Sequence, residues 1–248
     1  MSFDLASISK TKRARAPKVV IYGPSKIGKT TFGASAPNAV GILTEEGTDA
    51  IDTQAFPLCR SLDDVHAAIG VLATEEHNYE NVFLDSLDWL EPLIHEAVCK
   101  RLEIASIEAA GYGKGYVEAL TEWRTVLEGL DVLRNERNMG VICIAHDQIK
   151  KFDSPTTESY DTYSMKLHKM AAALFEEWAD VIGFANKQVF TRMEDAGFNK
   201  KEAKATTSGV RMLYLNRHPA YLAGNRFSLP DMPLDWDGFY SALIEAVK

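Results

Sequence analysis

The sequence predicts an α/β fold: a mostly parallel central sheet with helices on both faces and β-hairpins late in the chain. Short β-branched, apolar runs alternate with longer segments of helical period, as expected when crossover helices join parallel strands. The first run, residues 19–22, leads directly into a glycine-containing loop and then into a segment that can open a helix. At 248 residues, one α/β domain with decorations is the natural expectation.

The loop at residues 23–30 fits the phosphate-binding pattern G-x-x-x-x-G-K-[ST] without a gap. Its glycines let backbone N–H groups crowd around phosphate oxygens, and the strand before it and the helix after it supply the required context. Lys29 is expected to reach the β- and γ-phosphates, and Thr30 to place its hydroxyl on Mg²⁺. The predicted nucleotide-binding residues are Gly23, Pro24, Ser25, Lys26, Ile27, Gly28, Lys29, Thr30 and Thr31.

The strand expected at residues 81–86 closes on Asp85 and has the Walker B form. In that motif, the carboxylate at the end of the strand holds Mg²⁺ directly or through water. A second buried strand, residues 39–43, and a helix at residues 61–73 capped by Ser61 lie between the phosphate loop and Asp85. This intervening βα unit strengthens the assignment of Asp85, together with the loop threonine, as a metal ligand.

The later helices and strands are predicted from the same two patterns, namely the helical period of apolar residues and the short apolar runs typical of strands. Helices are expected at residues 87–108, 116–138 and 166–178 and from about Asp237, and strands at residues 139–145, 181–190 and 210–215. Two polar segments, residues 147–165 and 194–208, are expected to be loops, the first of them mobile.

Composition and charge exclude several classes of protein. The formal net charge of −8 argues against a surface coated in basic residues, although local basic patches are present. The sequence has no apolar run as long as a membrane span and no hydrophobic N-terminal segment typical of a signal peptide. Three cysteines without CxxC spacing indicate reduced thiols, so we expect a cytoplasmic protein without a membrane partner.

The motifs together resemble those of the RecA-like ATPases, most of all the short, phage-encoded members that consist of little more than the recombinase core. The matching segments are residues 23–31, 43–48, 82–86 and 142–146, and the resemblance covers about residues 17–230. It implies a RecA-like core at residues 17–248 that binds and hydrolyses ATP with Mg²⁺. Residues 1–16 are expected to form a basic, flexible N-terminal arm, because Lys10, Lys12, Arg13 and Arg15 precede the first strand.

The resemblance also implies roles for individual residues. A Glu after the second strand activates the attacking water in that group, which points to Glu46, with Glu45 as the rival. His146, which ends a strand, matches the residue that senses the γ-phosphate. Arg226 is the expected arginine finger for a neighbouring subunit, because Gly224 stands where related proteins often carry a Lys. Glu46 and His146 both follow predicted parallel strands, where open α/β sheets bind ligands.

The same group assembles on single-stranded DNA as a filament or a ring and promotes annealing or strand exchange, so we expect a homo-oligomer whose ATP hydrolysis is stimulated by DNA. The two polar segments are the expected contacts, through Lys150, Lys151, Lys200, Lys201 and Lys204, with Phe152, Tyr160, Tyr163 and Phe198 available to stack on bases. In the arm, Phe3 and Ala6 have the F-x-x-A form by which some recombinases dock onto the next subunit.

Two other classes of protein stay open at this point. A regulatory P-loop NTPase, such as a helicase loader or a packaging motor, would use the same phosphate loop to drive a partner. A small-molecule kinase would need an Arg-rich lid, and no compact Arg cluster follows the core. The base of the nucleotide is also open, since no base-reading residue is identified.

Overall fold

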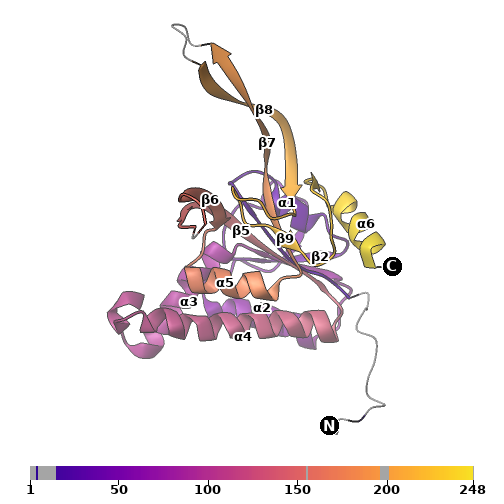
Figure 1. The fold of residues 1–248 in the computed structure, drawn as a ribbon. Helices are drawn as coiled ribbons and strands as arrows, with labels where there is room; N and C mark the ends of the chain where they lie inside the picture. The colour runs from indigo at the N-terminus through magenta and orange to yellow at the C-terminus, as the bar shows by residue number, and fades with distance from the viewer. Residues whose placement is uncertain (1–3, 5–14, 155, 196–200, 248) are drawn as a thin grey trace.

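The structure is a computed structural model that describes residues 4, 15–154, 156–195 and 201–247 (Figure 1). The strands are β1 (Lys18–Gly23), β2 (Ala39–Leu43), β3 (Gln54–Ala55), β4 (Asn81–Asp85), β5 (Gly140–Phe152), β6 (Tyr160–Met165), β7 (Val181–Asp195), β8 (Lys201–Tyr214), β9 (Gly224–Asn225) and β10 (Met232–Pro233). The helices are α1 (Lys29–Ala34), α2 (Leu62–Thr74), α3 (Leu87–Leu102), α4 (Lys114–Glu136), α5 (Lys169–Trp178) and α6 (Trp236–Val247), with a 3₁₀ helix at Ile107–Ala110.

These strands form one sheet in the order β10-β8-β7-β1-β5-β4-β2-β3, with β6 added to β5 and β9 added to β7. Neighbours from β7 to β3 run parallel, whereas β6, β8, β9 and β10 pair antiparallel. The expected mostly parallel sheet is therefore confirmed. The strand that carries the phosphate loop lies between β7 and β5, and β5 separates it from the Walker B strand β4.

Helices cover both faces of the sheet, as expected (Figure 1). On one face, α2, α3, α4 and α5 bury a core in which the rings of Trp123 and Phe175 meet edge to face at 5.2 Å. On the other face, α1 and α6 bury a second core, where Phe32 packs at 5.3 Å against Trp236. Among the helices described, none combines the length and the apolar composition needed to cross a membrane.

Several predicted helix boundaries can now be compared with the observed ones. The helix capped by Ser61 is confirmed, because Ser61 and Asp64 exchange the two hydrogen bonds of a capping box. The helix expected at residues 87–108 ends at Leu102, where Glu103 takes a left-handed backbone conformation with φ of 54°. The helix expected from residue 166 begins at Lys169, because β6 extends to Met165.

The two segments expected to be loops are mainly β-structure, so that expectation was wrong. β5 continues past the sheet to Phe152 and pairs antiparallel with β6, which makes most of residues 147–165 a hairpin. β7 extends to Asp195 and pairs with β8 from Lys201 onward, and the two form a long ribbon that projects from the body (Figure 1). Polar strands that are paired only with each other still satisfy their backbone hydrogen bonds, which explains how these segments form strands without an apolar pattern.

An aromatic cluster joins the bases of both hairpins to β1. Phe184 of β7 lies 5.0 Å from Tyr22 of β1 and 5.1 Å from Tyr163 of β6, measured between ring centroids. Tyr221 packs on Phe184 at 5.1 Å and on Tyr214 of β8 at 5.0 Å. Tyr163 was expected to be free for stacking on bases, but its ring is committed to this cluster.

Replacing Tyr22 with Phe should test how much the hydrogen bonds of the Tyr22 hydroxyl contribute to the stability of the protein. The buried Tyr22 hydroxyl lies 2.7 Å from the carbonyl oxygen of Leu222 and 3.1 Å from that of Tyr163. Its loss leaves buried acceptors without their donor, which should cost about 1–2 kcal/mol of unfolding free energy in urea. Tyr112→Phe, at a fully exposed ring, is the control and should change little. Equal stability of Tyr22→Phe and wild type would contradict this expectation.

Candidate nucleotide-binding site

The phosphate loop forms one wall of a cleft of about 420 Å³ at the carboxyl edge of the parallel strands. The cleft is lined by Ser25, Lys26, Gly28, Lys29, Thr30, Thr31, Glu45, Glu46, Gly47, Thr48, Ile51, Asp85, His146 and Arg211. The strands bring these segments together because β1, β5, β4 and β2 run parallel and end near one another. The structure thus gathers the predicted metal-binding residues, the predicted catalytic residues except Arg226, and most of the predicted loop residues into one cleft, whereas Gly23, Pro24 and Ile27 do not line it.

Lys29 lies along the inside of its own loop. Its ammonium donates to the carbonyl oxygens of Gly23 at 2.8 Å and Pro24 at 3.0 Å, and the residue is only 5% exposed. Burial lowers the pKa of Lys29, while the nearby Asp85 carboxylate acts in the opposite direction. A cation held in this position lines the cleft, where phosphate oxygens would be stronger acceptors than the two carbonyls, which suits the binding of a phosphate chain.

Thr30 and Asp85 form the second part of the site. The Thr30 hydroxyl donates to Oδ2 of Asp85 at 2.6 Å, across the junction between the loop and β4. Burial raises the pKa of Asp85, whereas the hydrogen bond from Thr30 and the charge of Lys29 oppose this shift. A hydroxyl and a carboxylate are the oxygen donors that Mg²⁺ prefers, so the two side chains fit a magnesium site. Mg²⁺ bound there would neutralise part of the phosphate charge.

His146 is paired with Asp88, a residue that the sequence reasoning missed. The backbone N–H of His146 donates to Oδ1 of Asp88 at 2.9 Å, and its ring Nδ1 lies 3.0 Å from Oδ2. The hydrogen bond to Asp88 raises the pKa of His146, against the effect of burial. Burial alone would raise the pKa of Asp88, but its hydrogen bonds with His146 outweigh burial and lower it. Asp88 therefore orients the imidazole and favours its charged form.

The two candidate catalytic acids differ in their surroundings. Thr44, the residue before them, is locked to Ser86 by two hydrogen bonds, since its Oγ1 donates to the Ser86 carbonyl at 2.7 Å and accepts from the Ser86 N–H at 2.9 Å. Glu45 is half-buried, lies 3.9 Å from His146, and has its pKa raised by burial. Glu46 also lines the cleft but is exposed. This geometry favours the rival, Glu45, because it is the half-buried acid that lies near His146 in the cleft.

Arg211 is a second residue that the sequence reasoning missed. It lies on β8, and its guanidinium Nη1 donates to the carbonyl oxygen of Ile27 in the phosphate loop at 3.3 Å. The only signal in the sequence was a basic residue within the strand expected at residues 210–215, and nothing there indicated that it would reach the loop. A fixed positive charge therefore joins the cleft from the antiparallel part of the sheet.

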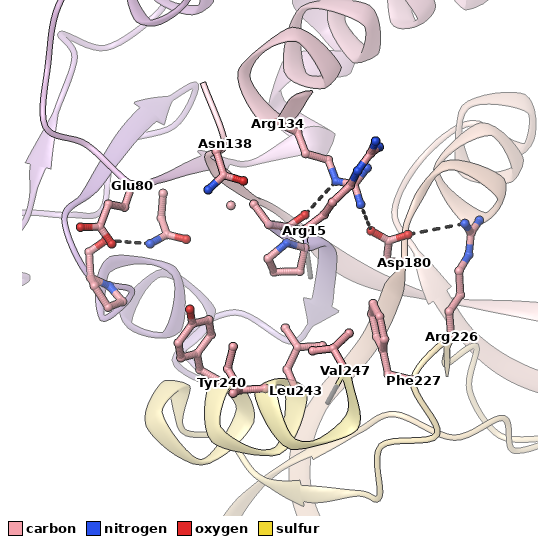
Figure 2. Close-up of a pocket in the computed structure, with 16 residues that line it drawn as sticks. Arg15, Glu80, Arg134, Asn138, Asp180, Arg226, Phe227, Tyr240, Leu243 and Val247 are labelled. Atoms are coloured by element: carbon pink, nitrogen blue, oxygen red, sulfur yellow. Dashed lines mark hydrogen bonds and ion pairs between the residues drawn. The ribbon is translucent and has the colours of Figure 1, made fainter. Parts of the chain in front are cut away.

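Arg226 lies at the opposite edge of the sheet, in another cleft of about 760 Å³ beside α6 (Figure 2). Its guanidinium donates to the Glu177 carbonyl at 2.9 Å and lies 3.5 Å from Asp180. Asp180 is also bound by Arg134 at 3.1 Å and accepts from the backbone N–H of Lys18, which begins β1. Arg226 therefore does not reach its own chain's phosphate loop, and an action on a neighbouring subunit stays a prediction.

The other predicted residues are only partly placed. Lys150 and Lys151 lie on the β5–β6 hairpin, where the Lys150 ammonium lies 3.4 Å from the Leu167 carbonyl and Lys151 is exposed. Lys201 and Lys204 are residues of β8. Phe3, Ala6, Phe198 and Lys200 lie outside the described residues.

The fold and the cleft define a P-loop domain of the nucleoside triphosphatase type, built on a mostly parallel sheet. A family model described as an AAA domain matches residues 15–227, which is most of the chain. The chain therefore belongs to this AAA domain family, whose members are ATPases.

Comparison with solved structures finds one described as the crystal structure of the RadB recombinase. It is 19% identical to this chain, the match covers 85% of this chain and 86% of the other, and the TM-score is 0.45. A similarity this low carries no argument about function. No curated protein matches the sequence.

Replacing Asp88 with Asn should make the stability of the protein depend differently on pH. Because the folded-state pKa of His146 is raised, the His146–Asp88 pair stabilises the fold fully below about pH 6.5, the ordinary pKa of histidine, and this contribution is lost as pH rises through the raised value. Asp88 stays ionised there, since its own pKa is lowered. The loss of unfolding free energy in Asp88→Asn, measured in urea without nucleotide, should be larger at pH 6 than at pH 8.5. A loss that is the same at both values would contradict the pairing.

Proposed function

We propose that the protein is a Mg²⁺-dependent ATPase that acts on single-stranded DNA, by annealing or strand exchange, in recombination of the phage type. One observation carries this proposal. The two strands that flank β1, namely β5 and β7, both continue past the nucleotide cleft as antiparallel hairpins. A chain organised in this way presents two protruding surfaces directly beside the site of ATP hydrolysis (Figure 1).

The hydrolytic step is assigned to residues of the cleft. Lys29 and the N–H groups of the loop would bind the phosphates, and Thr30 and Asp85 would hold Mg²⁺, which would supply positive charge to the phosphate oxygens. Glu45 positions the attacking water and accepts its proton, because its raised pKa makes it a better base than an exposed carboxylate. His146, oriented by Asp88, donates to the γ-phosphate.

The β5–β6 hairpin supplies the chemistry expected of a surface that binds single strands. Lys151 is exposed, Ile149 is 62% exposed, and Phe152 is 42% exposed with its ring 5.3 Å from that of Tyr160. Exposed aromatic rings stack on bases, and Lys attracts the phosphate backbone. Because β5 also carries His146, this hairpin is joined to the nucleotide cleft by a continuous strand.

Lys200, Lys201 and Lys204 make the second proposed contact with DNA, and the last two of these belong to β8 of the ribbon. The proposal includes assembly into a homo-oligomer, as a filament or a ring. In it, Arg226 acts on the neighbouring subunit's phosphates, and Phe3 and Ala6 of the arm help to hold the subunits together.

Measuring ATP hydrolysis with and without single-stranded DNA tests the proposed function. We expect DNA to stimulate turnover in the wild type, and Lys29→Ala to lower turnover by orders of magnitude in a folded protein, because the cation facing the phosphates is gone. Lys151→Ala is expected to reduce stimulation without changing the basal rate. Near-normal hydrolysis by folded Lys29→Ala would refute the nucleotide assignment, and a rate unaffected by DNA would refute the DNA assignment.

Comparing Glu45→Gln with Glu46→Gln identifies the base. Both variants keep the shape of the side chain but lose its ability to accept a proton, so ATP should still bind to each. The position of Glu45 near His146 predicts that Glu45→Gln loses turnover by about 10²-fold or more while Glu46→Gln retains most of it. An inactive Glu46→Gln beside an active Glu45→Gln would restore the assignment based on the family resemblance.

A further inference from the structure

We propose that Arg211 binds the phosphate chain of the nucleotide from within the same subunit and thereby links the cleft to the base of the β7–β8 ribbon. This inference rests on the proposed function, since it concerns the same nucleotide. Arg211 lines the cleft together with Lys29, Thr30 and Asp85, although it comes from β8. Among the described residues that line this cleft, the Lys and Arg side chains other than Arg211 belong to the phosphate loop itself, and His146 comes from β5.

The guanidinium of Arg211 is already in contact with the loop that binds phosphates. Its Nη1 lies 3.3 Å from the Ile27 carbonyl oxygen, and a methyl group built on Gly28 would meet the same nitrogen at 2.7 Å. Gly28, with φ of 111°, leaves this approach open in a conformation that other residues rarely adopt. A guanidinium so placed has further N–H donors available for phosphate oxygens, which bind it more strongly than a carbonyl does.

The backbone of Arg211 is anchored to the body. Its carbonyl accepts from the N–H of Leu234 at 2.9 Å, and its neighbour Met212 pairs with Pro233 of β10. Across the ribbon, Arg211 pairs with Lys187 of β7. Arg211 is therefore the residue at which β8, followed along the chain, passes from the ribbon into the sheet.

The pairing of β7 with β8 becomes irregular next to Arg211, on the side of the ribbon. Lys187 pairs with Arg211, but Val189 pairs with Thr207, so residues 208–210 form a bulge on β8. Gly209 within it has φ of 77°, a left-handed conformation. Bulges bend a strand and re-aim its side chains, and they are common next to active sites. Here the bulge directs β8 so that Arg211 faces the cleft, and it separates the anchored base from the projecting ribbon.

These two features give the proposed link its physical basis. The guanidinium contacts the loop carbonyl of Ile27 at the wall of the cleft, so a phosphate chain bound in the cleft would compete with this carbonyl for the same N–H donor. This competition takes place at a residue that pairs with Lys187 of β7 and whose carbonyl accepts a hydrogen bond from Leu234, the residue after β10. Binding of the nucleotide then changes the pairing of β8 beside the bulge.

Equilibrium binding of β,γ-imido-ATP to the full chain tests the first part. We expect Arg211→Ala to weaken binding by about tenfold or more, the range for a hydrogen bond to a charged group, and Arg211→Lys to keep most of the affinity. Arg217→Ala is the matched control, because Arg217 is exposed, follows the same strand and does not line the cleft. Wild-type affinity in Arg211→Ala, or equal losses in Arg211→Ala and Arg211→Lys, would overturn the inference.

Hydrogen exchange of backbone amides tests the link to the ribbon. At saturating β,γ-imido-ATP, the wild type and Arg217→Ala should change protection at residues 186–189 and 207–212, whereas Arg211→Ala should not. The same change in Arg211→Ala would overturn the link. If the wild type fails to bind the analogue at all, the proposed function falls together with this inference. If it binds and Arg211→Ala behaves like it, this inference alone falls.

Discussion

The register of the parallel strands is the constraint on which the nucleotide cleft depends. Gly23 at the end of β1 lies opposite His146 of β5, and Asp85 at the end of β4 reaches Thr30. Since successive side chains of a strand point to opposite faces, a slip of one residue would turn Asp85 away from Thr30. These strands are buried on both faces, by α2–α5 on one and by α1 and α6 on the other. Packing of the two cores therefore fixes the geometry of the cleft.

The elements that carry the cleft were predictable because each depends on a local pattern. Apolar runs marked the parallel strands, and a capping residue with helical period marked α2. The hairpins were not predictable in the same way. In the β5–β6 hairpin, Lys150 pairs with Thr162 and Lys151 with Asp161, and neither strand beyond the sheet shows an apolar run or a clear alternation. Each hairpin joins neighbouring segments, but the alternation that marks an antiparallel strand with one buried face is missing, so the composition resembles that of a loop.

The residues of the candidate site also fall into two groups, those that a local motif predicts and those that only the structure reveals. The phosphate loop and Asp85 follow from motifs, and the structure brings them together. Asp88 looks like an ordinary acid in the first turn of a helix, and it becomes a partner of His146 only because α3 starts beside the end of β5. Arg211 meets the loop only because β8 pairs with β7, which lies next to β1. Contacts of this kind arise from sheet order, which no short stretch of sequence specifies.

Sheet order also decides how the cleft is connected to the hairpins. Tyr22, the residue before the phosphate loop, packs on Phe184 of β7 and lies within hydrogen-bonding distance of the Tyr163 carbonyl of β6. The strand that carries the loop is thus packed against the bases of both hairpins. Because close-packed interiors transmit strain, a displacement of β1 would also displace the bases of both hairpins. β5 adds a direct connection through His146, and β8 adds one through Arg211, so each hairpin is joined to the cleft by a residue that lines it and by a shared aromatic base.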